Sequence, residues 1–114
     1  MGAALRTDIE DGAFIDRRVV PRYPFLSKCL MHVSAEKYHV EIRDVSIYGI
    51  GICAKGSGIE DKLQQKQHVS IEWRYGEEVN ATVVWSFKGH YGLLLTPALE
   101  DNHPLLVKAR TDHD

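Results

Sequence analysis

The sequence predicts an all-β protein, a six-stranded antiparallel β-barrel with a short C-terminal helix and a flexible N-terminal arm. Three observations support this fold class. Six short apolar runs between residues 24 and 96 are separated by turn-forming pieces. Residues 1–15 are polar and show neither helical nor strand periodicity. After Pro97 the spacing of apolar residues becomes helical.

The six predicted strands have the alternation of a sheet with one dry face and one wet face. In the run from residue 67 to 75, Val69, Ile71 and Trp73 alternate with polar residues. A flat sheet of six such strands would leave two edges exposed, so we expect the sheet to close into a barrel. The expected strands are residues 24–33, 37–46, 48–54, 67–75, 78–87 and 90–96.

The C-terminal segment predicts a short helix that covers one opening of the barrel. Asp101 or Asn102 can cap its N-terminus, and Pro104 is tolerated in its first turn. Its apolar face consists of Leu105, Leu106 and Ala109.

The domain organisation follows from these elements. With 114 residues, the chain is long enough for one hydrophobic core. We expect an N-terminal arm at residues 1–15, one domain at residues 16–110 and a C-terminal tail at residues 111–114.

Composition and charge narrow the classes of function. The formal net charge of -2 argues against a broad positive surface for long nucleic acid, so an anionic partner should be small. No segment approaches the roughly 20 apolar residues that cross a bilayer, and the start of the chain lacks the apolar core of a secretory signal. We therefore expect a cytoplasmic protein without membrane insertion.

Catalytic and metal chemistry find little support in the sequence. It shows no paired acid and base, nucleophile motif or phosphate-binding glycine loop, so we expect neither an enzyme nor a cofactor. Cys29 and Cys53 are too far apart for a CxxC motif and are expected to remain thiols inside strands. His32 and His39 can face each other across a hairpin but lack a third ligand, so no metal site is expected.

A basic cluster stands at the entrance to the first apolar run. The stretch DRRVVPRYPF, residues 16–25, contains Arg17, Arg18 and Arg22. A solvated basic surface is the simplest interpretation of such a cluster when nothing else accompanies it. An anion site becomes the better interpretation if complementary groups meet it elsewhere in the fold.

Such groups occur in the stretch RDVSIYG, residues 43–49. Val45 and Ile47 are out of phase with the strand alternation before them, so the strand must bulge or turn near Asp44. Asp44 and Ser46 can then project together from the strand end, while Gly49 allows a backbone geometry or close approach that a side chain would block. Alternatively, Asp44 and Ser46 only cap a turn.

These two stretches, together with a third, resemble a known family. Arg18–Arg22 has the form RxxxR, Asp44–Gly49 has the form [D/N]xSxxG, and Ala81–Leu95 contains AxVVW followed by YGLLL. Their order and spacing are similar to those of PilZ domains, small six-stranded barrels that bind the bacterial second messenger cyclic di-GMP. The resemblance covers roughly residues 16–110 and implies a PilZ-type β-barrel.

The resemblance also implies roles for single residues. In the family, the RxxxR arginines contact guanine and phosphate, and the Asp and Ser of the second motif contact the base and backbone of the ligand. An arginine in the position of Arg17 accompanies two stacked ligand molecules. Trp85 is either an apolar wall of the site or part of the core, since it alternates in phase with Ala81, Val83 and Phe87. The candidate ligand-binding residues are Arg17, Arg18, Arg22, Asp44, Ser46, Gly49 and Trp85.

Three functions are consistent with this sequence. The first is a cyclic di-GMP receptor that changes conformation on binding and acts in trans on an unidentified downstream protein. The second is a PilZ protein that works as an interaction module without ligand, although such relatives commonly lack the motifs. The third is a small barrel for single-stranded nucleic acid, which would need aromatic and basic residues interleaved across a strand face.

Overall fold

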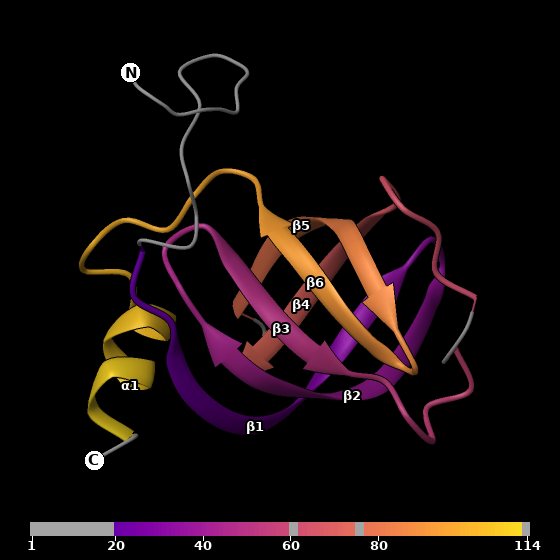
Figure 1. The fold of residues 1–114 in the computed structure, drawn as a ribbon, viewed down its shortest axis with the longest axis horizontal. Helices are drawn as coiled ribbons and strands as arrows, with labels where there is room; N and C mark the ends of the chain where they lie inside the picture. The colour runs from indigo at the N-terminus through magenta and orange to yellow at the C-terminus, as the bar shows by residue number, and fades with distance from the viewer. Residues whose placement is uncertain (1–19, 60–61, 75–76, 113–114) are drawn as a thin grey trace.

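The computed structural model describes residues 20–59, 62–74 and 77–112, and the statements below refer to these residues. They form a closed antiparallel barrel of six strands with one C-terminal helix (Figure 1). The predicted barrel and helix are therefore confirmed. The arm expected at residues 1–15 lies outside the described residues.

The strands follow one another around the barrel in a simple order with one crossover. The order is β1-β2-β3-β6-β5-β4, and β1 pairs with β4 to close the sheet. Lys88 and Gly89 form the two-residue connection between β5 and β6, and both have positive φ, as the twist of a tight hairpin requires. The elements are β1 (Tyr23–Val33), β2 (Glu36–Val45), β3 (Gly49–Cys53), β4 (His68–Arg74), β5 (Glu77–Phe87), β6 (His90–Leu95) and α1 (Pro104–Asp112).

The pairing of β2 with β3 is irregular at the position that the sequence predicts. Its register shifts between Ile42 and Asp44, so that Ile42 pairs with Ile52 and Asp44 pairs with Gly51. The bulge near Asp44 is therefore confirmed. Because Ile50 and Ile52 are buried, Gly51 between them faces the outside of the barrel, where Asp44 meets it.

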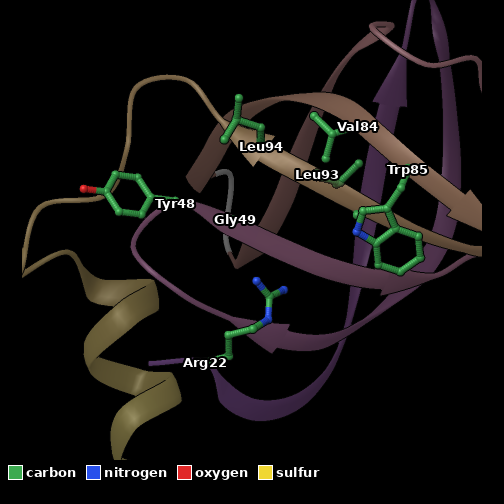
Figure 2. Close-up of a pocket in the computed structure, with 8 residues that line it drawn as sticks. Arg22, Tyr48, Gly49, Val84, Trp85, Leu93 and Leu94 are labelled. Atoms are coloured by element: carbon green, nitrogen blue, oxygen red, sulfur yellow. The ribbon is translucent and has the colours of Figure 1, made fainter. Parts of the chain in front are cut away.

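A second irregularity changes the environment of Trp85. Ala81 and Val83 are buried, but Trp85 is 50% exposed and Phe87 is 64% exposed. The alternative that placed Trp85 in the core is therefore wrong. Trp85 is exposed because the register of the β5–β6 pair shifts: Val83 pairs with Leu93, and Trp85 pairs with the next residue, Gly92. This shift turns the Trp85 side chain to the outer surface (Figure 2).

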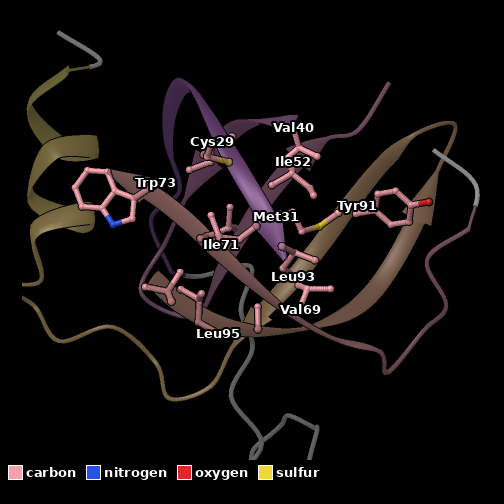
Figure 3. Close-up of a cluster of buried hydrophobic side chains, with 14 of the residues drawn as sticks. Cys29, Met31, Val40, Ile52, Val69, Ile71, Trp73, Tyr91, Leu93 and Leu95 are labelled. Carbon is pink, nitrogen blue, oxygen red and sulfur yellow. The ribbon is translucent and has the colours of Figure 1, made fainter. Parts of the chain in front are cut away.

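The barrel interior is filled by the inward-facing residues of all six strands. Met31, Ile71 and Leu93 come from three different strands and point into the same interior (Figure 3). Each is at most 2% exposed, and full burial of such a side chain contributes about 1.5–3 kcal/mol. This packed core gives the outer face of the sheet a rigid support.

The helix α1 packs against β1 and β2 beside the barrel (Figure 1). Leu105, Leu106 and Ala109 are fully buried, which confirms the predicted apolar face. The expected cap is wrong, because the ring Nδ1 of His103 accepts the hydrogen bond from the backbone N–H of Leu105 at 3.1 Å. Asp101 instead holds the other end of the helix.

The C-terminal end of α1 is fixed by side-chain hydrogen bonds. Arg110 donates to the carbonyl oxygen of Asp101 at 2.9 Å and to its carboxylate at 2.7 Å. The hydroxyl of Thr111 donates to the carbonyl of Lys108 at 3.1 Å. The helix extends through Thr111 to Asp112, two residues beyond the expected domain end at residue 110. Within the described residues, no helix is both long and apolar enough to cross a membrane.

Candidate functional site

The structure brings the two sequence motifs together through one pair of side chains. Arg22 lies directly before β1, and Asp44 lies near the end of β2. The guanidinium of Arg22 donates a hydrogen bond to the Asp44 carboxylate. Their side chains are 43% and 35% exposed. Such an exposed ion pair contributes only about 0–1 kcal/mol to stability, so a ligand can replace either partner at low cost.

A shallow pocket opens beside this pair on the outer surface of the barrel. Its volume is about 210 Å³. Figure 2 shows the guanidinium of Arg22 and the indole of Trp85 facing the same open space from different elements. The lining residues are Arg22, Tyr48, Gly49, Val84, Trp85, Gly92, Leu93 and Leu94.

The pocket thus combines a cation and an aromatic ring. Arg22 supplies a positive fork, and Asp44 next to it supplies an acceptor-only carboxylate. Trp85 supplies a half-exposed apolar ring surface. These groups suit a ligand that carries negative charge, hydrogen-bond donors and a flat ring system.

The comparison with family models identifies the family of this chain. The PilZ domain model matches residues 16–108, which is more than half of the chain. The chain belongs to the PilZ domain family. This family binds cyclic di-GMP. The comparison with curated proteins gave no match. The match of the PilZ domain model confirms the family that the sequence motifs predicted.

The RxxxR motif of the PilZ domain lies only partly within the described residues. Arg22, its second arginine, lines the pocket. Arg17 and Arg18 lie outside the described residues. The structure therefore places one of the three candidate arginines at the site.

The serine of the second PilZ motif has a structural position. Ser46 is only 2% exposed, and its hydroxyl accepts hydrogen bonds from the backbone N–H groups of Tyr48 at 3.2 Å and Gly49 at 3.1 Å. The backbone N–H of Ser46 also donates to the carbonyl of Gly49 at 2.8 Å. Ser46 thus has the turn-capping arrangement that the sequence left open as an alternative.

The glycine of the same motif is required by the backbone. A Cβ atom at Gly49 would lie 2.8 Å from the carbonyl oxygen of Leu93 on the neighbouring strand. The close approach expected at Gly49 is therefore present. The adjoining turn is fixed as well, because the N–H of Leu95 donates to the carbonyl of Tyr48 at 2.8 Å.

Several pocket residues were not candidates from the sequence. Tyr48 lies inside the second motif, between its serine and its glycine, and this position could have indicated from the sequence that Tyr48 lines the pocket. Val84, Gly92, Leu93 and Leu94 lie in the strand pair whose likeness to PilZ domains was noted without a role. Assigning them required the hairpin register, which depends on the irregularity at Trp85.

One other group of side chains has the character of metal ligands. His32, Glu72 and Glu78 each offer a donor atom, and these atoms lie within 4.8 Å of one another. However, the Nε2 atom of His32 is 2.9 Å from a carboxylate oxygen of Glu72, and the hydroxyl of Ser70 donates to Glu78. The group comes from β1, β4 and β5 and contributes no residue to the lining of the pocket.

Proposed function

We propose that this PilZ domain is a cyclic di-GMP receptor and that Arg22, Asp44 and Trp85 bind the ligand. The observation that carries the proposal is the Arg22–Asp44 pair, which joins both PilZ motifs at the edge of a pocket. Ser46 and Gly49 support the site by fixing the turn between β2 and β3. The bound ligand is expected to change the surface that a partner protein meets.

The chemistry of cyclic di-GMP matches these groups. The ligand has two phosphates and two guanines. The arginine fork can hold a phosphate through two parallel bonds, bind guanine O6 and N7, or stack on the purine face. The carboxylate of Asp44 can accept hydrogen bonds from guanine N–H donors, and the indole of Trp85 can cover a base.

The size of the pocket supports a role for further groups. Its volume of about 210 Å³ is below the roughly 300–1,000 Å³ of sites that enclose a small molecule. Most of the ligand must therefore contact something else. We assign this role to Arg17 and Arg18 and to a second, stacked ligand molecule.

A route from the ligand to a partner surface starts next to Arg22. The ring of Tyr23, the following residue, lies under the guanidinium of Arg110 at 5.6 Å from the ring centroid. Arg110 belongs to α1 and also holds Asp101. A shift of Arg22 toward the ligand thus moves a residue that contacts the helix. We propose α1 as the element that a partner protein in the cytoplasm senses.

Calorimetric titration with cyclic di-GMP tests the receptor function. We expect saturable binding with two ligand molecules per chain, and a ratio of one in the Arg17→Ala variant. Cyclic di-AMP is the matched control, because it has the same phosphates and different bases. Absence of binding would favour the alternative of a PilZ protein that works as an interaction module without any ligand. Binding of a short single-stranded oligonucleotide more tightly than cyclic di-GMP would support the alternative of a barrel for single-stranded nucleic acid.

A further inference from the structure

Four residues form one lateral row across the outer surface of the site. Asp44 on β2 pairs with Gly51 on β3, Gly51 pairs with Gly92 on β6, and Gly92 pairs with Trp85 on β5. Two adjacent glycines therefore lie between a carboxylate and an indole. Both glycines are buried although neither has a side chain, so the space over these two neighbouring strands is filled from the flanking strands.

The carboxylate of Asp44 occupies the space above Gly51. A Cβ atom at Gly51 would lie 2.9 Å from one carboxylate oxygen of Asp44 and 3.0 Å from the other. Both distances are shorter than ordinary contacts of carbon with oxygen, so the side chain would have to move. The same carboxylate receives the hydrogen bond from Arg22. The missing side chain at Gly51 is thus a condition for the observed Arg22–Asp44 pair.

The indole of Trp85 occupies the space above Gly92 in the same way. A Cβ atom at Gly92 would lie 1.9 Å from Nε1 of Trp85 and 2.3 Å from Cε2. The ring therefore lies directly against the backbone of the neighbouring strand. An alanine at Gly92 would force the indole away from this position.

We propose that Gly51 and Gly92 are positioning residues of the ligand site. They allow the Asp44 carboxylate and the Trp85 indole to lie directly over the sheet before the ligand arrives. This inference rests on the proposed function, because it concerns how the cyclic di-GMP site is prepared. A side chain that is already held in this geometry loses less conformational freedom on binding than a mobile side chain, so the entropic cost of binding is smaller.

Gly49 provides the contrast that separates positioning from folding. The Cβ atom added there meets the backbone carbonyl of Leu93, which cannot rotate away. The three atoms nearest to a Cβ added at Gly51 or Gly92 belong to a side chain, which can rotate at its own χ angles. Gly49→Ala is therefore expected to lower the melting temperature, whereas Gly51→Ala and Gly92→Ala leave it close to that of the parent protein.

Titration of these variants with cyclic di-GMP tests the proposal as a double-mutant cycle. Gly51→Ala should weaken binding about 10-fold or more, as expected when a charge-assisted contact is lost. In an Asp44→Ala background the same change should alter affinity less than about 2-fold, because Gly51 acts through Asp44. Gly92→Ala should likewise weaken binding in the parent protein but alter affinity less than about 2-fold in a Trp85→Ala background, because Gly92 acts through Trp85. Unchanged affinity, or an equal loss in both backgrounds, would overturn the proposal.

A readout on the ligand-free protein keeps this test independent of the proposed function. Gly92→Ala should shift the indole N–H resonance of Trp85 in NMR spectra and leave that of buried Trp73 in place. Gly51→Ala should shift the side-chain Nε resonance of Arg22. If the parent protein does not bind cyclic di-GMP, the receptor function fails, and these spectra still decide the positioning role. Unmoved resonances would exclude it.

Discussion

The guanidinium of Arg22 donates a hydrogen bond to the carboxylate of Asp44, 22 residues later in the chain. This contact connects the entrance of β1 with the bulge in β2, and thus the two motifs by which the PilZ domain was recognised. Because both side chains are partly exposed, the contact is worth more for recognition than for stability.

Arg22→Ala and Asp44→Ala should each weaken cyclic di-GMP binding by about 2–3 kcal/mol, the scale of a lost charge-assisted bond, which is roughly 30- to 150-fold. The melting temperature should change little. Arg43→Ala is the matched control, since Arg43 is an exposed arginine next to Asp44 that pairs with Glu41 at 3.4 Å. Calorimetric titration of the three variants with cyclic di-GMP tests this prediction. If Arg22→Ala and Asp44→Ala bind the ligand as tightly as Arg43→Ala does, neither residue belongs to the site.

Ser46→Ala should act mainly on stability. The hydroxyl accepts two backbone N–H groups in a buried turn, and leaving buried donors unpaired costs about 1–3 kcal/mol. For a domain of this size, each kcal/mol corresponds to roughly 4–8 °C in melting temperature. Ser27→Ala is the control, because the Ser27 hydroxyl has only a long contact of 3.4 Å with the carbonyl of Lys28. An unchanged Tm together with a large loss of affinity would show that Ser46 contacts the ligand directly.

The sequence predicted the fold closely because local rules govern most of it. Alternation located the strands, and the phase change after Ile42 located the bulge at Asp44, since polar and apolar residues there exchange sides visibly. The bulge at Trp85 left no such mark. Val83 and Trp85 are both apolar, so the pattern reads the same whether or not the strand slips.

The site was only partly readable for a similar reason. Charged and hydroxyl residues within a motif can be selected as site candidates from the sequence alone. Arg22 and Asp44 were selected in this way, and they form a hydrogen bond in the structure. The burial of Ser46 depends on the turn that its own hydroxyl closes. The importance of Gly51 and Gly92 depends on the strand register, which two bulges shift and which pairs them with Asp44 and Trp85. The helix cap also escaped prediction, because Asp101 bonds to Arg110 while His103 takes the capping position.

Trp85→Ala should weaken ligand binding by about 1–3 kcal/mol, the range for a base stacked on an aromatic side chain. This corresponds to roughly 5- to 150-fold. Stability should fall less than on removal of a core side chain, because the ring is half exposed. Phe87→Ala is the control, since Phe87 lies on the same strand, is more exposed and does not line the pocket. Equal effects of the two changes in calorimetry would contradict a specific role for Trp85.

Cys29 should make stability depend on alkaline pH. Burial raises the pKa of its thiol from 9.0 to about 12, with a smaller contribution from the charge of Glu41. The folded state therefore keeps a proton that the unfolded state releases above pH 9.0. The resulting stability is complete below that pH and falls by about 1.4 kcal/mol per unit as pH rises toward 12.

The comparison that isolates this effect is the melting temperature of the parent protein and of Cys29→Ala between pH 8 and pH 10.5. The parent protein should lose more stability over this range than the variant. Iodoacetamide at pH 8.5 should modify the partly exposed Cys53 and spare Cys29 in the folded protein. A parallel decline of both proteins, or rapid modification of Cys29, would contradict the assignment.

Ligand binding is expected to slow amide hydrogen exchange in residues 10–22. Residues 10–15 belong to the part of the sequence without apolar periodicity, and all three candidate arginines follow by residue 22. Among the described lining residues of the pocket, Arg22 is the only one of these arginines. Recruiting the others costs about 1–2 kcal/mol for each residue that becomes ordered, which lowers affinity but makes the bound surface differ from the free one. Val69–Trp73 in β4 is the internal control, because its inward-facing residues are already buried in the core and its exchange should not change. If residues 10–22 are equally protected with and without cyclic di-GMP, the ligand does not order this segment. The proposed signal to a partner would then rest on the contact of Tyr23 with Arg110 alone.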